Sequence, residues 1–344
     1  MENEKLRKIY DAFAASGSFV SATPVEGQDA YHVVANAEAE YILQRFRPGL
    51  SARVPDMIRN KEMVYGHVRN RLLRQNVRDI TRKHVTCFHT YRQQPYYKDH
   101  EGNYWTLTLF IKETHVSEHV SSPAVAREIG VGLGTFVQRT RDFDPRLLKE
   151  SMPGYQNVSR WQQRLQESLE TTSDDRKNAA ATPVEQLRPF DEKARAWQET
   201  LEEEMLPARV THNTFSAGSV LLDRNDRSLC VINLETVMPG ILHYDFGDGA
   251  RSACAPSGQF DAGFFREFAS GFMQQAGRLL ARKERETLHL ACELMPYLQT
   301  IRKLVAFLRE GATRDLLEAM KHLSFLLSAA RERRSTKEYI TACP

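Results

Sequence analysis

The chain has 344 residues, of which 41% are hydrophobic and 26% are charged, so a disordered, collagen-like or disulfide-rich protein is excluded. Its 47 lysines and arginines stand against 44 aspartates and glutamates, and the net charge of +3 is too small to predict binding to nucleic acid or to an anionic membrane. The length fits two domains or one unit of two lobes, either of which can bury a large core.

The sequence carries no signal for a membrane or for secretion. No stretch approaches the roughly 18–20 uncharged apolar residues that a membrane span requires, and the N-terminus lacks the apolar segment of a signal peptide. The five cysteines are an odd number without CxxC spacing, which is typical of free thiols in a reducing compartment. We therefore expect a cytoplasmic protein.

The first part of the chain is predicted to form an antiparallel sheet with one long helix. Apolar residues recur at helical spacing over 5–15, which predicts a short first helix. The range 54–75 has a broad apolar stripe with Pro55 near its first turn, which is typical of a long amphipathic helix. Four β-rich runs separated by turn-forming residues predict two hairpins, with strands at 30–35, 40–46, 84–91 and 104–113.

From Pro123 onwards the pattern is mainly helical, with one small hairpin. The segment 171–182 is polar and Ala-rich, and we interpret it as a mobile loop. Short apolar runs at 220–222 and 229–232 flank a turn-forming cluster, and we expect the functional site at this hairpin. The predicted helices span 123–140, 159–170, 183–205, 260–280, 283–309 and 313–331.

Two short motifs look functional but are interpreted as structural. Gly130-Val131-Gly132-Leu133-Gly134 lacks the GxGxxG spacing and lies within a helical pattern, so it predicts a helix face of small residues. His115-Val116-Ser117-Glu118-His119 matches H-x-x-E-H, a zinc motif that requires a helix to bring both histidines to one face. Here the motif continues a strand, where the two histidines would be roughly 13 Å apart. We expect a solvated connector.

The most informative segment spans 211–248. In one-letter code it contains THNTFSAGSVLLD (211–223), CVINLETVMPG (230–240) and YDFGD (244–248). With these motifs the sequence resembles the aminoglycoside phosphotransferase and choline-kinase-like superfamily, most closely its N-acetylhexosamine 1-kinase branch. That branch has HND, an Asn five residues later, VIDLDTVMPG and YDFGD. Further matches in family order extend over nearly the whole chain, from Tyr41–Arg45 to Ile301-Arg302.

The resemblance implies an α+β fold of two lobes, like that of the protein kinases. The N-lobe sheet and long helix would occupy 1–112, a hinge 113–122, and a mainly helical C-lobe 123–344, with the catalytic and metal loops at 211–248. In such a site, metal ions neutralise the phosphates of ATP and an Asp accepts the proton of the substrate hydroxyl.

The resemblance places the catalytic Asp of the family at Thr214, its metal-binding Asn at Ser219 and its metal-binding Asp at Asn233, so no catalytic residue is intact. A threonine has no carboxylate to accept a proton, and loss of a general base lowers a rate by about 10²–10⁴-fold. Ser219 and Asn233 offer neutral oxygens, whereas Mg²⁺ prefers carboxylates and phosphates. Binding of ATP and Mg²⁺ is therefore expected to be weakened.

Some polar groups of the family's site remain. Glu235, the counterpart of the second Asp in VIDLDT, and Asn233 are weak candidates for a metal ligand. Arg302 stands where the family keeps an Arg toward the substrate, and a structural ion pair is an equally good interpretation. Asp245 is expected to bond the backbone of the catalytic loop. The candidate residual pocket consists of His212, Asn213, Glu235, Asp248 and Arg302.

The candidate nucleotide contact from the sheet is Arg45. Because alternate residues of a strand share a face, Arg45 lies on the same face as Tyr41 and Leu43, and Gln44 takes its place if the register slips by one. The usual partner acid on the long helix aligns near Arg59, with Glu62 one turn away. An arginine there predicts that the usual ion pair is missing.

The sugar-contacting GHIND of the family aligns with Gly17–Ser21, where Ser18 and Ser21 replace the His and the Asp. Loss of charge with retention of packing is the pattern of a pseudokinase. We expect a catalytically degenerate relative of sugar kinases that acts as a binding, scaffold or regulatory protein toward a small molecule, a nucleotide or a protein. The alternative is an enzyme whose repurposed cleft transfers a group to a sugar-like substrate, with Glu235, Asp248 or His212 as base and ligand.

Overall fold

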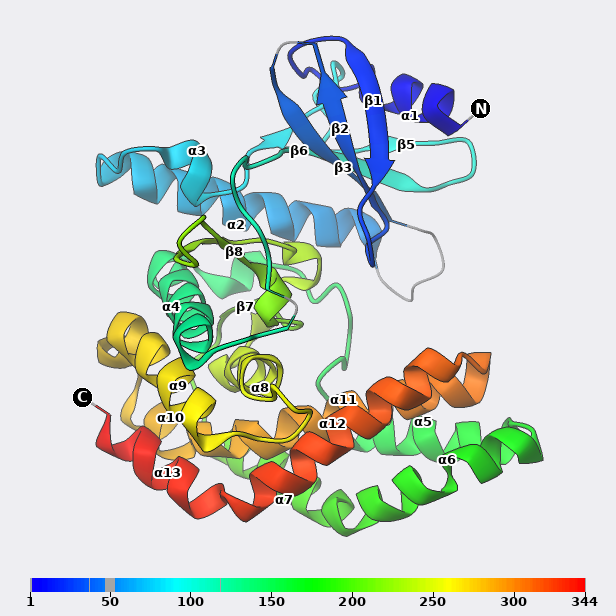
Figure 1. The fold of residues 1–344 in the computed structure, drawn as a ribbon, viewed down its shortest axis with the longest axis vertical. Coiled ribbons are helices and arrows are strands. Elements are labelled where there is room, and N and C mark those ends of the chain that lie inside the picture. Colours follow the sequence, from blue (N-terminus) through cyan, green and yellow to red (C-terminus); the bar gives the residue numbers. More distant parts are fainter. Residues whose placement is uncertain (1, 37, 47–52, 118, 344) are drawn as a thin grey trace.

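The computed structural model describes residues 2–36, 38–46, 53–117 and 119–343. Ala37 of the expected first turn and Glu118 of the H-x-x-E-H motif lie outside these ranges. The N-terminal part is an antiparallel sheet with the long helix α2 beneath it, and the C-terminal part is mainly helical (Figure 1). The expected fold class is therefore confirmed. Within the described ranges, no helix combines the length and the apolar character that a membrane span requires.

The N-terminal sheet has the strand order β1-β2-β3-β6-β4, all antiparallel, with the short strand β5 also paired to β6. Helix α1 (Glu2–Tyr10) packs against it, α2 (Val54–Arg74) separates it from the C-terminal part, and the one-turn helix α3 (Ile80–Lys83) follows. The strands are β1 (Phe19–Pro24), β2 (Ala30–Ala35), β3 (Glu40–Phe46), β4 (Cys87–Phe88), β5 (Tyr97–Lys98) and β6 (Tyr104–Leu109).

Strands β2 and β3 confirm the sequence pattern, whereas two other strands differ from it. β1 was not predicted, because its Pro24 and its many exposed side chains weaken the strand pattern. A strand at the edge of a sheet tolerates both features. The predicted strand 84–91 is reduced to β4, since the backbone turns at Thr90, whose N–H bonds the carbonyl of Gln94. The turn between β1 and β2 points toward the C-terminal part (Figure 1).

The C-terminal helices confirm most of the predicted ones, but the predicted mobile loop at 171–182 is wrong. Helix α6 runs through it, because Asp174 and Asp175 suit a helix N-terminus and Ala180 and Val184 face the core. The helices are α4 (Pro123–Thr140), α5 (Val158–Thr171), α6 (Asp174–Leu187), α7 (Asp191–Glu203), α8 (Leu242–Ala253), α9 (Ala262–Ala276), α10 (Arg282–Thr287), α11 (Ala291–Glu310), α12 (Thr313–Arg331) and α13 (Arg333–Ala342).

Two of the predicted long helices are interrupted. A short 3₁₀ turn at Arg188–Phe190, which contains a proline, separates α6 from α7. A second 3₁₀ turn at Leu288–Leu290 separates α10 from α11. Helices α8 and α13 were not predicted at all.

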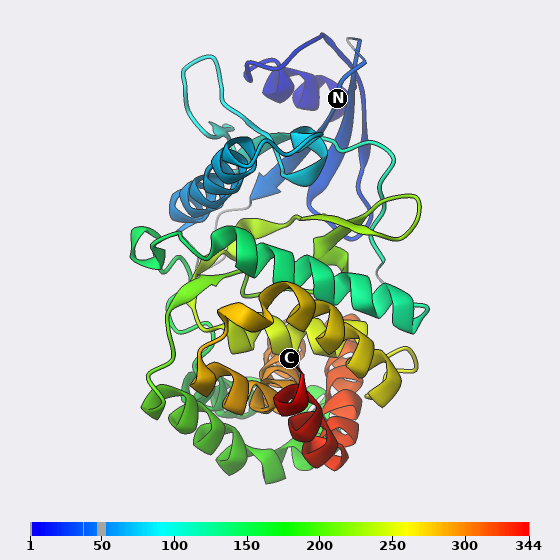
Figure 2. The same cartoon turned by 90° about the vertical axis from the view of Figure 1, so that its left-hand side faces the viewer.

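The glycines of α4 form the small-residue face that the sequence predicts. Helices α4 and α9 pack side by side (Figure 2). A Cβ at Gly130 would collide with the carbonyl oxygen of Phe268, and one at Gly134 would collide with the backbone of Phe272. The glycines therefore allow two helix backbones to approach closely, and they lie within a helix instead of a loop between a strand and a helix.

Two small two-stranded sheets carry the segment 209–240. β7 (Arg209–Thr211) pairs with β10 (Met238–Gly240), and β8 (Val220–Leu222) pairs with β9 (Ser228–Val231) as the predicted hairpin. The connection from β6 to α4 joins this hairpin through a β-bridge between His115 and Leu222. The described residues of the H-x-x-E-H motif are therefore in an extended connection and not on a helix.

Candidate functional site

A cavity of about 260 Å³ lies between the N-terminal sheet and the β8–β9 hairpin, and we call it the cleft cavity. Ile42 of β3 lines this cavity from the N-terminal sheet, and Leu221 and Ile232 line it from the region of the hairpin. Residues 108–111 and 114–116 also line it. One group of lining side chains is polar, namely Gln44, Lys61, Asn233 and Glu235.

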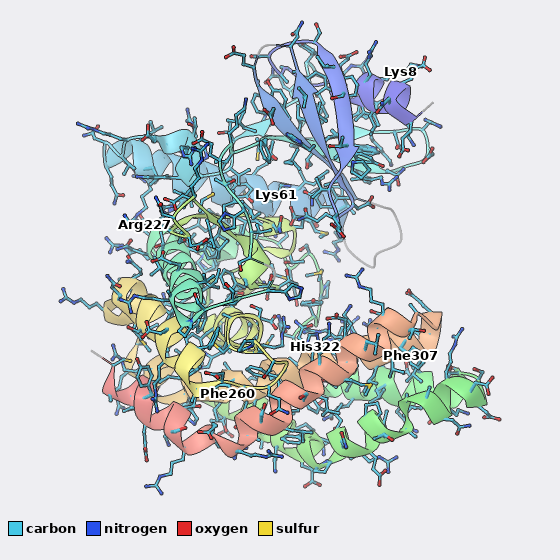
Figure 3. All side chains as sticks on the ribbon, viewed as in Figure 1. Lys8, Lys61, Arg227, Phe260, Phe307 and His322 are labelled. Atoms are coloured by element: carbon cyan, nitrogen blue, oxygen red, sulfur yellow. The ribbon has the colours of Figure 1, made fainter. Side chains whose placement is uncertain are left out.

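Lys61 is a central side chain of this polar group. It extends from α2 and is buried, at 3% exposure. Its Nζ donates to Gln44 Oε1 at 2.9 Å and lies 3.3 Å from Glu235 Oε1 and 3.4 Å from Thr106 Oγ1. Figure 3 shows Lys61 at the junction of α2 with the rest of the molecule. A buried cation is thus held at the cavity by one carboxylate and two neutral oxygens.

Arg45, the candidate nucleotide contact, does not line the cleft cavity. Its guanidinium bonds Asp29 Oδ1 at 2.8 Å from Nε and 2.5 Å from Nη2, and lies 5.5 Å from the ring centre of Trp105. Because side chains alternate along a strand, Arg45 faces away from the cavity and Gln44 faces into it. The structure therefore places the alternative residue, Gln44, at the cavity.

The long helix presents Lys61 to the cavity, whereas the resemblance places an acid of this helix near Arg59, with Glu62 one turn away. Glu62 instead pairs with His89, with 2.8 Å between Oε1 and Nε2. The signal that could have found Lys61 is its position on the apolar stripe of α2, between Ile58 and Val64. A lysine on such a stripe must either lie at a cavity or have a buried partner.

Thr214 is held by hydroxyl groups at the tip of its loop. Its Oγ1 lies 2.7 Å from Thr236 Oγ1, and the Thr236 hydroxyl donates to the carbonyl of His212 at 2.7 Å. Because the Thr236 hydroxyl donates its proton to the carbonyl oxygen of His212, it accepts from Thr214, so the Thr214 hydroxyl is the donor of this pair. This chain of hydrogen bonds closes the loop and contains no carboxylate, and the nearest basic atom is Nδ1 of the buried His212 ring, at 3.5 Å from Thr214 Oγ1.

The loop is anchored from below by Asp245 of α8. Its carboxylate accepts the backbone N–H groups of His212 and Asn213, each at 2.7 Å. Burial raises the pKa of Asp245 to about 7. The His212 ring is fully buried with Nε2 2.9 Å from the carbonyl of Ile232, and burial lowers its pKa. These groups hold the loop, as the resemblance implies for Asp245.

Ser219 and Asn233 do not form a cation site. Ser219 is buried, and its hydroxyl accepts the backbone N–H of Ser216 at 3.1 Å, so it is used in the local turn. Asn233 has a left-handed backbone, with a φ of 62°, and lines the cavity as a neutral amide. No three His, Cys, Asp or Glu side chains come together as a metal site in the described ranges. These residues do not fit the Mg²⁺ pair of a phosphoryl transfer site.

The expected residual pocket does not assemble, because Glu235 is its only member that lines the cleft cavity. Asp248 is fully buried, accepts from Gln299 Nε2 at 2.9 Å and pairs with Arg251 Nε at 3.2 Å. Arg302 forms no ion pair with the residues that the structure describes: its Nη2 donates at 2.6 Å both to the Tyr155 carbonyl and to Gln156 Oε1. Its guanidinium also stacks on the Tyr155 ring.

The segment Gly17–Ser21, which aligns with the sugar-contacting GHIND of the family, also lies away from the cleft cavity. Residues 19–21 begin β1, and neither Ser18 nor Ser21 lines the cleft cavity. A second cavity, of about 480 Å³, adjoins the cleft cavity at Gln28, Val116 and Asn233 and extends into the C-terminal part. We call it the basic cavity, because arginines and lysines dominate its charged lining.

Comparison with known proteins agrees with this architecture. The model of the phosphotransferase enzyme family, APH, matches residues 21–285, which is more than half of the chain. The chain belongs to this family. It is similar in structure to an aminoglycoside phosphotransferase from Alicyclobacillus acidocaldarius, with a TM-score of 0.65 and 13% identity over 95% of this chain and 96% of that one.

Two further solved structures share the fold of this phosphotransferase family member. An ethanolamine kinase from Plasmodium vivax has a TM-score of 0.62 and 11% identity over 95% of this chain and 86% of that one. A spectinomycin phosphotransferase has a TM-score of 0.59 and 12% identity over 96% of this chain and 98% of that one. At such identities the likeness shows the protein-kinase-like fold, and the site must be judged from its own residues.

Proposed function

We propose that this member of the phosphotransferase family is a pseudokinase, related to the N-acetylhexosamine kinases, that binds a nucleotide in its cleft cavity without fast phosphoryl transfer. The observation that carries this proposal is the closed hydroxyl chain at Thr214, where the resemblance places the catalytic carboxylate. Thr214 donates to Thr236 at 2.7 Å, and Thr236 donates to the backbone of His212.

The charges around the loop support the loss of transfer. Phosphoryl transfer requires cations that neutralise the phosphates and a carboxylate that orients the attacking hydroxyl. Among the described residues that line the cleft cavity, Glu235 is the only carboxylate, and it is already paired with Lys61 at 3.3 Å. At the position where the resemblance places a metal-binding Asp, Asn233 supplies only a neutral oxygen, which is a poor ligand for a hard cation.

The cleft cavity itself supports retention of a ligand. Its apolar walls and its polar group of residues suit a flat apolar ring system that carries an anionic group. Lys61 supplies the positive charge for that anionic group. The spectinomycin phosphotransferase has been solved with AMP and with ADP, and an amicoumacin kinase with AMP-PNP and Ca²⁺. A nucleotide is therefore the ligand class that we propose here.

The test is a calorimetric titration with ATP and GTP, with and without Mg²⁺, together with a transfer assay on N-acetylhexosamines. We expect binding that changes little on addition of Mg²⁺ and transfer below the range of ordinary kinases. The matched control restores the family residues in one variant, Thr214→Asp, Ser219→Asn and Asn233→Asp, which should make binding dependent on Mg²⁺. Transfer by the unmodified protein at ordinary kinase rates would overturn the proposal, as would the absence of nucleotide binding.

A second candidate is an enzyme that uses the cleft for other chemistry, because Glu235 still brings a carboxylate to the cavity. The other two groups of that hypothesis, His212 and Asp248, are fully buried and hold neighbouring groups, which counts against it. Glu235→Gln separates the two functions. An enzyme should lose its activity in this variant, whereas a pseudokinase should change only its affinity for the nucleotide.

A further inference from the structure

The basic cavity has a marked excess of positive charge. Among the described residues that line it, four cationic side chains stand against one carboxylate, that of Glu318, which gives this part of the lining an excess of three positive charges. The cations come from three helices: Arg251 from α8, Lys303 from α11, and Arg314 and Lys321 from α12. Elements far apart in the sequence therefore bring like charges to one cavity, which repels an ammonium group and attracts an anion.

The cations keep unused hydrogen-bond donors. Arg314 makes no side-chain hydrogen bond or ion pair with any part of the chain that the structure describes. Arg251 pairs with Asp248 through Nε at 3.2 Å, and that carboxylate is fully buried beneath it. Lys303 and Lys321 each have one carboxylate partner, at 2.9 and 3.2 Å, which leaves other ammonium protons available.

His322 shows that three of these cations converge. It is buried on α12 in the C-terminal part (Figure 3), and its Nδ1 lies 3.4 Å from Arg251 Nη1. Burial, together with the charges of Arg251, Lys303 and Lys321, lowers the pKa of His322 well below its usual value. The ring is therefore neutral and accepts from Arg251 at Nδ1, so its Nε2 carries a proton and is a further donor.

We propose that the basic cavity binds a small organic anion, a molecule of about monosaccharide size that carries a phosphate or a carboxylate. A volume of about 480 Å³ suits a ligand of that size. The anionic group would be bound by Arg251, Arg314 and Lys321, and the remainder would lie against Gly218 and Asn233. This inference goes beyond the proposed function, because it concerns a second ligand in a separate cavity.

The test is a calorimetric titration of the full chain with glucose 6-phosphate, glucuronate and pyrophosphate, with glucose and glucosamine as neutral and cationic comparators. Glucose 6-phosphate and glucose differ only in the charged group, so we expect binding of the first and not of the second. Binding should weaken when salt is raised from 50 to 300 mM, because salt screens partly exposed charges. The comparison of glucose 6-phosphate with glucuronate shows which anionic group is preferred.

Two variants assign the binding to this cavity. Arg314→Gln and Lys321→Gln should each weaken the best anion by about tenfold, the effect of losing one charge-assisted hydrogen bond. Lys337→Gln, an exposed lysine on α13, is the matched control and should change nothing. The inference is overturned if none of the three anions binds, if glucose binds equally well, or if Arg314→Gln and Lys321→Gln bind like the unmodified protein.

The same variants separate this inference from the proposed function. Arg314→Gln should leave the affinity for ATP unchanged, because Arg314 does not line the cleft cavity. If ATP fails to bind while glucose 6-phosphate binds, the proposed function is wrong and the second site stands. If ATP binding falls with Arg314→Gln, the anion in the basic cavity is the nucleotide's own phosphate and the second site is wrong.

Discussion

The loop at 212–214 has a buried side and a side toward the cleft, and the two sides differ in whether the polar group expected from the resemblance is present. On the buried side, Asp245 accepts two backbone N–H groups at 2.7 Å, and Asn213 Nδ2 donates to the carbonyl of Thr211 at 3.0 Å. On the side toward the cleft, a threonine stands where the resemblance places a catalytic carboxylate. The difference teaches that the groups that hold this segment in place are separate from the group at the position of the catalytic carboxylate, so the two can change independently.

The largest expected effect comes from breaking the buried side. Asp245→Ala leaves two buried N–H groups without an acceptor, each of which costs about 1–3 kcal/mol, so we expect the free energy of unfolding to fall by about 3–5 kcal/mol. Urea unfolding measures this change. Glu185→Ala, at an exposed position away from the N-terminus of α6, is the control and should stay within about 0.5 kcal/mol of the unmodified protein. Equal stability of the two variants would contradict the anchoring role of Asp245.

The neutral ring of His243 makes the next contribution on the buried side, and its dependence on pH opposes that of Asp245, whose raised pKa makes protonation below about pH 7 favour the folded state. His243 lies on the same helix as Asp245, its Nε2 donates to Thr287 Oγ1 at 2.9 Å, and its buried Nδ1 has no hydrogen-bond partner among the described residues. Burial lowers the pKa of His243 to about 3, so the unfolded chain takes up this proton as the pH falls below about 6.5 while the folded chain does not. The stability that the neutral ring contributes is therefore complete above pH 6.5 and lost toward pH 3.

For His243 alone, this loss amounts to about 2 kcal/mol at pH 5. Urea unfolding at pH 7.5 and pH 5 measures it, and His243→Gln should flatten the dependence on pH by about that amount. A variant on the cleft side, Asn233→Ala, is the comparison and should keep the full dependence. An unchanged slope in His243→Gln would show that the ring is not held neutral.

A smaller effect is expected on the cleft side. Lys61→Met removes the buried cation of the cleft cavity, and we expect the Kd for ATP to rise about tenfold, or about 1.4 kcal/mol. Glu62→Gln, on the neighbouring position of α2 and paired with His89, is the control. Calorimetric titration compares the two. If both variants bind ATP equally, Lys61 does not contact the nucleotide.

The smallest effect should come from Thr214 itself. Thr214→Val keeps the shape of the side chain and removes one hydrogen bond at a partly exposed position, so we expect a loss of stability of at most about 1 kcal/mol. Thermal unfolding measures it, and the titration with ATP should be unchanged. A large loss of any transfer activity in this variant would show that Thr214 takes part in chemistry.

The regular elements with strong patterns were predictable, and the exceptions have physical reasons. β2, β3 and α4 have their predicted bounds because alternating or helical apolar spacing decides which face is buried. The segment 171–182 was taken for a mobile loop because it is polar and Ala-rich. The structure makes it part of a helix because Ala180 and Val184 find a core to pack against, which no local pattern records.

The sequence by itself determined which side chains stand at the three positions where the resemblance places catalytic and metal-binding residues, since the identities of Thr214, Ser219 and Asn233 do not depend on how the chain packs. Only the tertiary structure decided which groups face the cavities. The alternation of β3 defines two faces but not which one meets the C-terminal part, so Gln44 and not Arg45 lines the cleft. Lys61 and the cations of the basic cavity come together through helices that are distant in sequence, and such convergence exists only in the folded chain.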